Sequence, residues 1–160
     1  MSRQNFNRSM KAMIYWEEIT NEMEDIATKY YLKGWKALVL HPGDVTTVVD
    51  GENGKQAKFR LVIPDSEFEA LDDLIGDEDV MFDEFEVFRG QVDELFLFVV
   101  IMLSIDSKHA VLFPVFYEFN VDREFIEAAR GEQSIYSEVT SFARSSKFVF
   151  SHKRTTILLP

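Results

Sequence analysis

The sequence predicts an α+β fold, in which a long N-terminal amphipathic helix packs on a mostly antiparallel sheet. Strand-like segments come in groups joined by short turns, and single helical segments separate the groups. The predicted order is α-βββ-α-βββ-α-ββ. Hydrophobic residues make up 46% of the 160 residues, and 15 of them are Phe, enough for a sizeable core. We expect residues 1–160 to form a single globular domain in which residues 1–9 are flexible.

The first helix is expected over residues 10–33. Ser9 can cap its start, and Gly34 provides the left-handed residue that commonly ends a helix. Hydrophobic residues recur three or four positions apart and therefore lie on one helical stripe. The stripe consists of Trp16, Ile19, Met23, Ile26 and Tyr30, and is widened by Met13, Ala27 and Tyr31.

Three strands are predicted next, at residues 35–41, 44–50 and 55–63, and their short connections predict a meander. Pro42-Gly43 fits the central positions of a type II turn, because proline fixes φ and glycine accepts a positive φ. A second helix follows Pro64. Ser66 with Glu69 three residues later is typical of a capping box.

The next group of strands is predicted at residues 81–89, 95–105 and 110–119. The segment 95–105 is almost continuously apolar, which indicates a central strand covered on both faces. Either another helix or a second subunit could supply the second cover, so we consider a homodimer. Pro114 indicates a bulge or an edge position. A third helix over 121–130 and two strands near 135–142 and 147–152 complete the predicted order.

The formal net charge is −11, and it is concentrated in one segment. Residues 65–94 contain thirteen acidic residues against Arg89 alone, whereas the tail 144–154 is basic. This acidic face is either a solvated surface or a surface for a basic protein partner. The negative charge argues against nucleic acid and against anionic membranes as partners.

Two further features bear on location. The longest apolar run, residues 95–103, is too short to span a bilayer as a helix, and no apolar segment of a secretory signal follows the polar residues 1–9. We therefore predict a cytoplasmic protein. The absence of cysteine excludes disulfides, thiol catalysis and cysteine-ligated metals.

Candidate functional residues are few. No catalytic motif, metal-ligand spacing or phosphate-binding glycine loop occurs, so we predict no catalytic residue, metal or cofactor. His41 and Asp44 lie three residues apart in a turn, where an imidazole and a carboxylate could bind a ligand or orient a base. The simpler interpretation is that Asp44 caps the turn and His41 ends a strand. His152 could converge on this site or read an anionic group; otherwise it ends a surface strand.

These observations favour a non-catalytic binding or regulatory domain, in its sharpest version an inhibitor or immunity-type protein that blocks a basic partner. One alternative is a small-molecule-binding protein or hydrolase with a site near His41 and Asp44. Another is a structural homo-oligomer without a soluble ligand.

Short motifs across the chain also resemble a family of small uncharacterised proteins found mainly in haloarchaea and related archaea. The most specific motif is Leu-His-Pro-Gly-Asp-Val at residues 40–45, with Thr46 following it. The resemblance implies a stand-alone cytoplasmic domain and supplies no activity or catalytic residue. The chain departs from a salt-adapted composition in its 17 Lys+Arg and its many Phe residues, which would fit a non-halophilic relative. The other resembling pieces are Trp16 with Asp25, Gly34-Trp35, Ile63-Pro64-Asp65 and Phe148–His152.

Overall fold

The computed structural model describes residues 3–51, 55–76, 80–131, 134–143 and 145–160. Within these ranges the chain forms three α-helices, eight strands and a short 3-10 helix. The helices are α1 (Arg3–Leu32), α2 (Asp65–Ile75), α3 (Arg123–Gly131) and the 3-10 helix η2 (Thr155–Leu158). The strands are β1 (Lys36–Val39), β2 (Asp44–Asp50), β3 (Gln56–Val62), β4 (Glu84–Val92), β5 (Leu95–Ser104), β6 (His109–Glu118), β7 (Ile135–Thr140) and β8 (Phe148–His152).

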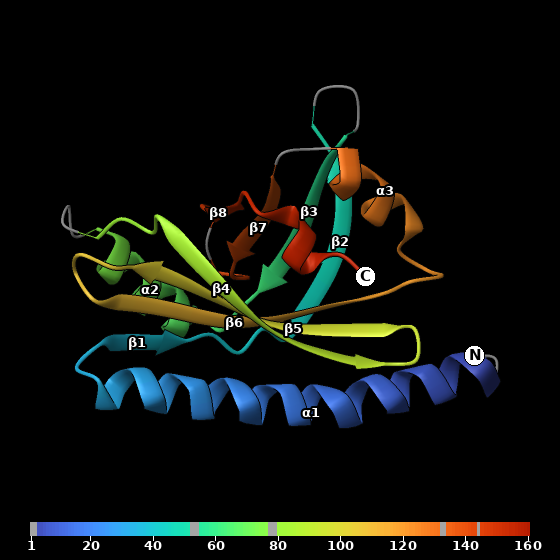
Figure 1. The fold of residues 1–160 in the computed structure, drawn as a ribbon, viewed down its shortest axis with the longest axis horizontal. Helices are drawn as coiled ribbons and strands as arrows, with labels where there is room; N and C mark the ends of the chain where they lie inside the picture. The colour runs from blue at the N-terminus through green and yellow to red at the C-terminus, as the bar shows by residue number, and fades with distance from the viewer. Residues whose placement is uncertain (1–2, 52–54, 77–79, 132–133, 144) are drawn as a thin grey trace.

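The elements form three layers (Figure 1). Helix α1 lies along one side, a first sheet packs on it, and a second sheet packs on the first. Sheet A has the strand order β1-β6-β5-β4 and sheet B the order β2-β3-β7-β8. Four of the six strand pairs are antiparallel, while β1–β6 and β3–β7 are parallel. The predicted α+β class, the element order and the packing of the long helix on a sheet are confirmed.

Helix α1 packs on sheet A through the predicted stripe. Ile19, Met23 and Ala27, four residues apart, are buried against β5 and β6. Gly34 ends the segment with φ +87°, as predicted. The helix begins at Arg3 rather than near residue 10, so it contains Ser9 and covers most of the segment that we expected to be flexible. Met13 and Tyr31 are exposed, so the stripe is narrower than predicted.

Strand β5 is the centre of the hydrophobic core. All ten of its residues are buried, and their side chains alternate between two clusters. The residues facing α1 are Leu95, Leu97, Val99, Ile101 and Leu103, and those facing sheet B are Phe96, Phe98, Val100 and Met102. The second cover is therefore sheet B of the same chain. No second subunit is needed to bury this strand.

The predicted meander of the first three strands is wrong. Strand β1 pairs in parallel with β6, with Lys36 opposite His109, and only β2 and β3 form a hairpin. Residues 40–43 carry the chain from sheet A to sheet B instead of turning it back. Accordingly, Gly43 has no positive φ, so the predicted type II turn is wrong as well.

Two other local predictions have instructive outcomes. Helix α2 begins directly after Pro64 without a side-chain cap, so Ser66 lies inside the first turn and the capping box is wrong. Pro114 lies in β6, which has strands on both sides, yet β1 pairs only as far as Leu112. Beyond Leu112, β6 has no strand of the described chain on its β1 side, so the missing N–H of Pro114 costs no hydrogen bond between strands. This agrees with the predicted edge position.

The C-terminal segment is hydrogen-bonded to two strands of sheet A. The fully buried Tyr117 donates its hydroxyl hydrogen bond to the carbonyl oxygen of Leu158, at 2.7 Å. Arg89 of β4 donates to the carbonyl oxygen of Leu159, also at 2.7 Å.

Among the helices of the described ranges, none combines the length and apolar character that crossing a membrane requires.

Candidate ligand-binding site

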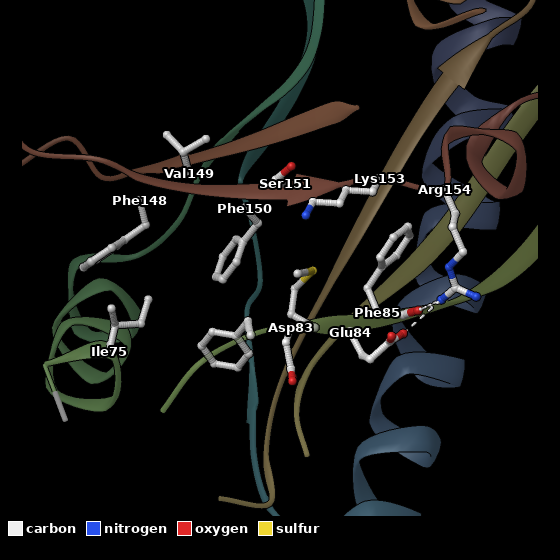
Figure 2. Close-up of a pocket in the computed structure, with 12 residues that line it drawn as sticks. Ile75, Asp83, Glu84, Phe85, Phe148, Val149, Phe150, Ser151, Lys153 and Arg154 are labelled. Atoms are coloured by element: carbon white, nitrogen blue, oxygen red, sulfur yellow. Dashed lines mark hydrogen bonds and ion pairs between the residues drawn. The ribbon is translucent and has the colours of Figure 1, made fainter. Parts of the chain in front are cut away.

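A cavity lies between the edge strands β4 and β8. Its volume is about 570 Å³, within the range typical of small-molecule sites. Its walls come from the end of α2, from β4, β5 and β8, and from the segments that flank β4 and β8. Figure 2 shows Ile75 and Phe148 at one end of the space and Arg154 at the other.

Four phenylalanines, Phe82, Phe85, Phe148 and Phe150, form much of the apolar lining of the cavity. Strand alternation turns Phe148 and Phe150 of β8 inward and leaves Val149 half-exposed. Phe150 meets Phe82 edge to face, with ring centroids 5.6 Å apart. Phe85 contributes the opposite wall from β4, so that an apolar group entering the cavity would contact rings on two sides.

Charged side chains lie at one end and along the rim. The guanidinium of Arg154 donates to the carbonyl oxygen of Phe85 at 2.6 Å and pairs with Glu84 at 3.4 Å, so it is already held by the protein. Lys153 is exposed and has neither a hydrogen bond nor an ion pair with another described residue. In Figure 2 its ammonium group extends toward the space between the rings of Phe150 and Phe85. Lys153 is thus the cation at this cavity that is free to meet a ligand.

His152 is fully buried rather than at a surface strand end, and a signal for this exists in the sequence. The alternation that buries Phe150 places His152 two residues later on the same inward face. Burial lowers its pKa to about 3, so the imidazole is neutral. Its Nε2 lies 2.7 Å from the hydroxyl of buried Ser137, while its Nδ1 has no partner among the described residues. The ring packs on Phe85, behind the cavity wall.

His41 has a role that sequence spacing did not reveal. Its Nε2 lies 2.7 Å from a carboxylate oxygen of Glu24 in α1, and its Nδ1 lies 2.8 Å from Glu67 in α2. The other oxygen of Glu67 accepts the backbone N–H of His41 at 2.5 Å. Carboxylates only accept hydrogen bonds, so both ring nitrogens donate, as in an imidazolium. Partial burial lowers the pKa of His41, but the bonds to Glu24 and Glu67 outweigh it and raise the pKa overall.

Asp44 lies apart from this ion-pair cluster. It lines an open depression of about 230 Å³ together with Trp16, Pro42 and Phe116, among others. Neither His41 nor His152 lines that depression, and no hydrogen bond joins the three predicted residues within the described chain. The structure therefore places His41, Asp44 and His152 in three separate environments. Ligand binding by His41, Asp44 and His152 stays a prediction.

The acidic segment and the basic tail partly pair with each other. Arg154 contacts Glu84, whereas Lys147 donates to Glu138 of β7 at 3.1 Å. The exposed carboxylates of the acidic segment are divided between α2 and the β4 region. Residues 77–79 and 144 lie outside the described residues.

Glu138 forms an ion cluster on the outer face of sheet B. Its side chain is only 3% exposed, and its carboxylate accepts hydrogen bonds from Lys58, Arg60 and Lys147 at 3.0, 3.0 and 3.1 Å. Burial raises the pKa of this carboxyl, but the three cations outweigh it and lower the pKa to about 2. Glu138 is therefore ionised over the whole physiological range, and the cluster is a structural feature of sheet B.

A family model described as a family of unknown function, DUF7529, matches residues 3–160. No curated protein and no solved structure matches the chain. The match covers nearly the whole chain, in line with a family of uncharacterised proteins. The archaeal distribution and the motif at residues 40–45 stay predictions.

Proposed function

The chain belongs to DUF7529, a family of unknown function, and we propose from its geometry that it is a non-catalytic binding domain. Its ligand is a small molecule that occupies the cavity between β4 and β8. The observation that carries this proposal is the cavity itself, about 570 Å³ in volume, with four phenylalanines in its lining and a cation, Lys153, that has no ion-pair partner among the described residues. Buried apolar walls with a few directed polar groups are the usual form of a ligand site.

The walls and charges define the class of ligand. Phe85 and Phe150 favour an aromatic or flat apolar body, which rings contact well on their faces and edges. Lys153 favours an anionic group, such as a carboxylate, sulfonate or phosphate. Arg154 would hold the end of the site in place through Phe85 and Glu84 rather than bind the ligand itself.

A non-catalytic role agrees with the position of the Ser137–His152 pair. A serine hydrogen-bonded to a histidine can act as a nucleophile only if substrate reaches it. Both side chains are fully buried in the core, and the ring of His152 packs behind Phe85. We interpret the pair as structural, because it satisfies the hydroxyl of Ser137 and the Nε2 of His152 in sheet B.

The proposal can be tested with the fluorescent dye 8-anilinonaphthalene-1-sulfonate, an aromatic anion of suitable chemistry. We expect the folded protein to bind one dye molecule with enhanced fluorescence. Ile75→Trp narrows the cavity from the α2 end and should abolish binding. Lys153→Met keeps the apolar stem but removes the charge, and should weaken binding by about 5-fold, as expected for one ion pair that is partly shielded from water.

The matched control is Lys29→Met, which removes the same charge from an exposed position on α1. It should bind the dye like the wild-type protein, and thermal unfolding should show that all three variants are folded. Dye binding by Ile75→Trp that equals wild type, or equal weakening in both lysine variants, would overturn the proposed site.

The location, the protein partner and the oligomeric state remain proposals. We propose a single cytoplasmic domain, and we keep the basic protein partner of the acidic face 65–94 as a second role. The observation that favours this role is the exposed aromatic ring of Phe88 on β4, which the acidic segment contains. A homodimer would have to use a surface other than β5, which sheet B already covers.

A further inference from the structure

A second concave surface lies on the opposite side of β4 from the ligand cavity. It is a groove of about 500 Å³ between α1 and β4, and its floor includes Ile19 of α1 and Leu97 of β5. Phe88 forms part of its wall and remains 39% exposed. Because β4 is the edge strand of sheet A in the described chain, the groove is open along that side.

The rim of the groove on the α1 side is acidic. Glu18 and Glu22 lie four residues apart on the helix, and both line the groove. Neither carboxylate has a hydrogen bond or ion pair with another described residue. Like charges at this spacing destabilise a helix, so a cation bound between them would relieve a repulsion that the free protein carries.

Gly90 gives the groove part of its depth. It lies in β4 with an ordinary strand φ, so no backbone strain requires glycine there. A Cβ atom at this position would lie 3.9 Å from Ile19 Cδ1 and 3.9 Å from the Leu97 carbonyl oxygen, which is ordinary contact. An alanine would therefore fit the fold while filling space in the groove.

We propose that this groove docks a basic segment of a partner protein, placing an apolar side chain against Phe88 and Ile19 and cations against Glu18 and Glu22. Charge complementarity supports this occupant. The groove has an apolar floor and two unpaired carboxylates, and the whole chain carries a net charge of −11, which would attract a basic segment over distance. This surface is separate from the ligand cavity, so the two proposals can fail independently; the groove rests on the second role proposed above and gives the basic partner a docking place beside Phe88.

The test measures binding of a short fluorescein-labelled peptide of alternating lysine and leucine by fluorescence anisotropy. We expect it to bind, and we expect peptides of alternating glutamate and leucine, or lysine and serine, to bind at least about 5-fold more weakly. The double variant Glu18→Gln/Glu22→Gln should weaken binding by about 5-fold, the order expected for two exposed ion pairs. Gly90→Ala should weaken it by about 3-fold through lost space.

The matched control is Glu17→Gln/Asp25→Asn, which removes two charges from exposed positions of the same helix outside the groove. It should bind the peptide like the wild-type protein. Equal weakening in both double variants would show attraction by net charge alone and would overturn the groove. Unchanged binding in Gly90→Ala would do the same. Self-association that Gly90→Ala abolishes would assign the groove to a second copy and refute a basic partner.

Discussion

Replacing Glu138 with glutamine tests how much a nearly buried carboxylate stabilises sheet B. The difference between its ordinary pKa of 4.5 and about 2 corresponds to about 3 kcal/mol of stability, at about 1.4 kcal/mol per pKa unit. Arg60 and Lys147 are 43% and 52% exposed, so water screens two of the three partners. We therefore expect Glu138→Gln to lower the free energy of unfolding by about 2 kcal/mol at pH 7.

The pH dependence gives this prediction its sign. Because the folded pKa is lowered, the stabilisation is complete above the unfolded pKa and is lost as pH falls through the folded pKa. The difference between wild type and Glu138→Gln should thus fall to less than about half its value at pH 3. Urea denaturation at the two pH values measures it, with the exposed Glu69→Gln as a control that changes stability little. A loss of unfolding free energy in Glu138→Gln of less than about 0.5 kcal/mol at pH 7, or a loss that does not change with pH, would refute the reasoning.

Two other features can be tested in the same way. Tyr117→Phe keeps the ring but leaves the carbonyl of Leu158 without its donor, and should cost about 1–2 kcal/mol in urea denaturation; an unchanged midpoint would show that this contact contributes nothing. In an NMR titration, His41 should protonate above pH 6.5 and His152 only near pH 3. The stabilisation that His41 provides is complete below pH 6.5 and is lost as pH rises through its folded pKa, so wild type and His41→Gln should converge in alkaline solution. Titration of both histidines at the same pH would contradict the two environments.

The sequence predicted what depends on neighbours along the chain. The stripe through Ile19 and Met23, the stop at Gly34 and the continuous burial of β5 follow from local periodicity and turn chemistry. The failed meander shows the limit of such arguments. Strand β1 is short and lies close to β2 in sequence, but its partner is β6, and tertiary packing rather than connection length decides that pairing.

The candidate sites show the same limit more clearly. The cavity draws its walls from segments as far apart as Ile75 and Arg154, so no spacing in the sequence indicates it. The partners of His41 lie 17 and 26 residues away on two different helices. His152 is different, because it shares the alternation of Phe148 and Phe150, a local signal for an inward-facing histidine that the prediction of a surface strand end overlooked.

The two parallel strand pairs also bear on how fast the chain folds. Hairpins such as β2–β3 and β4–β5 join segments that are close in sequence and can form early. The parallel pairs instead join distant segments: Lys58 of β3 lies opposite Tyr136 of β7, and Lys36 of β1 lies opposite His109 of β6. Each of these pairings closes a loop of more than seventy residues, so the entropic cost of closing the loop precedes the stabilising contacts between the strands. Refolding should therefore be limited by the assembly of preformed hairpins, on the millisecond-to-second scale typical of sheets with distant pairings.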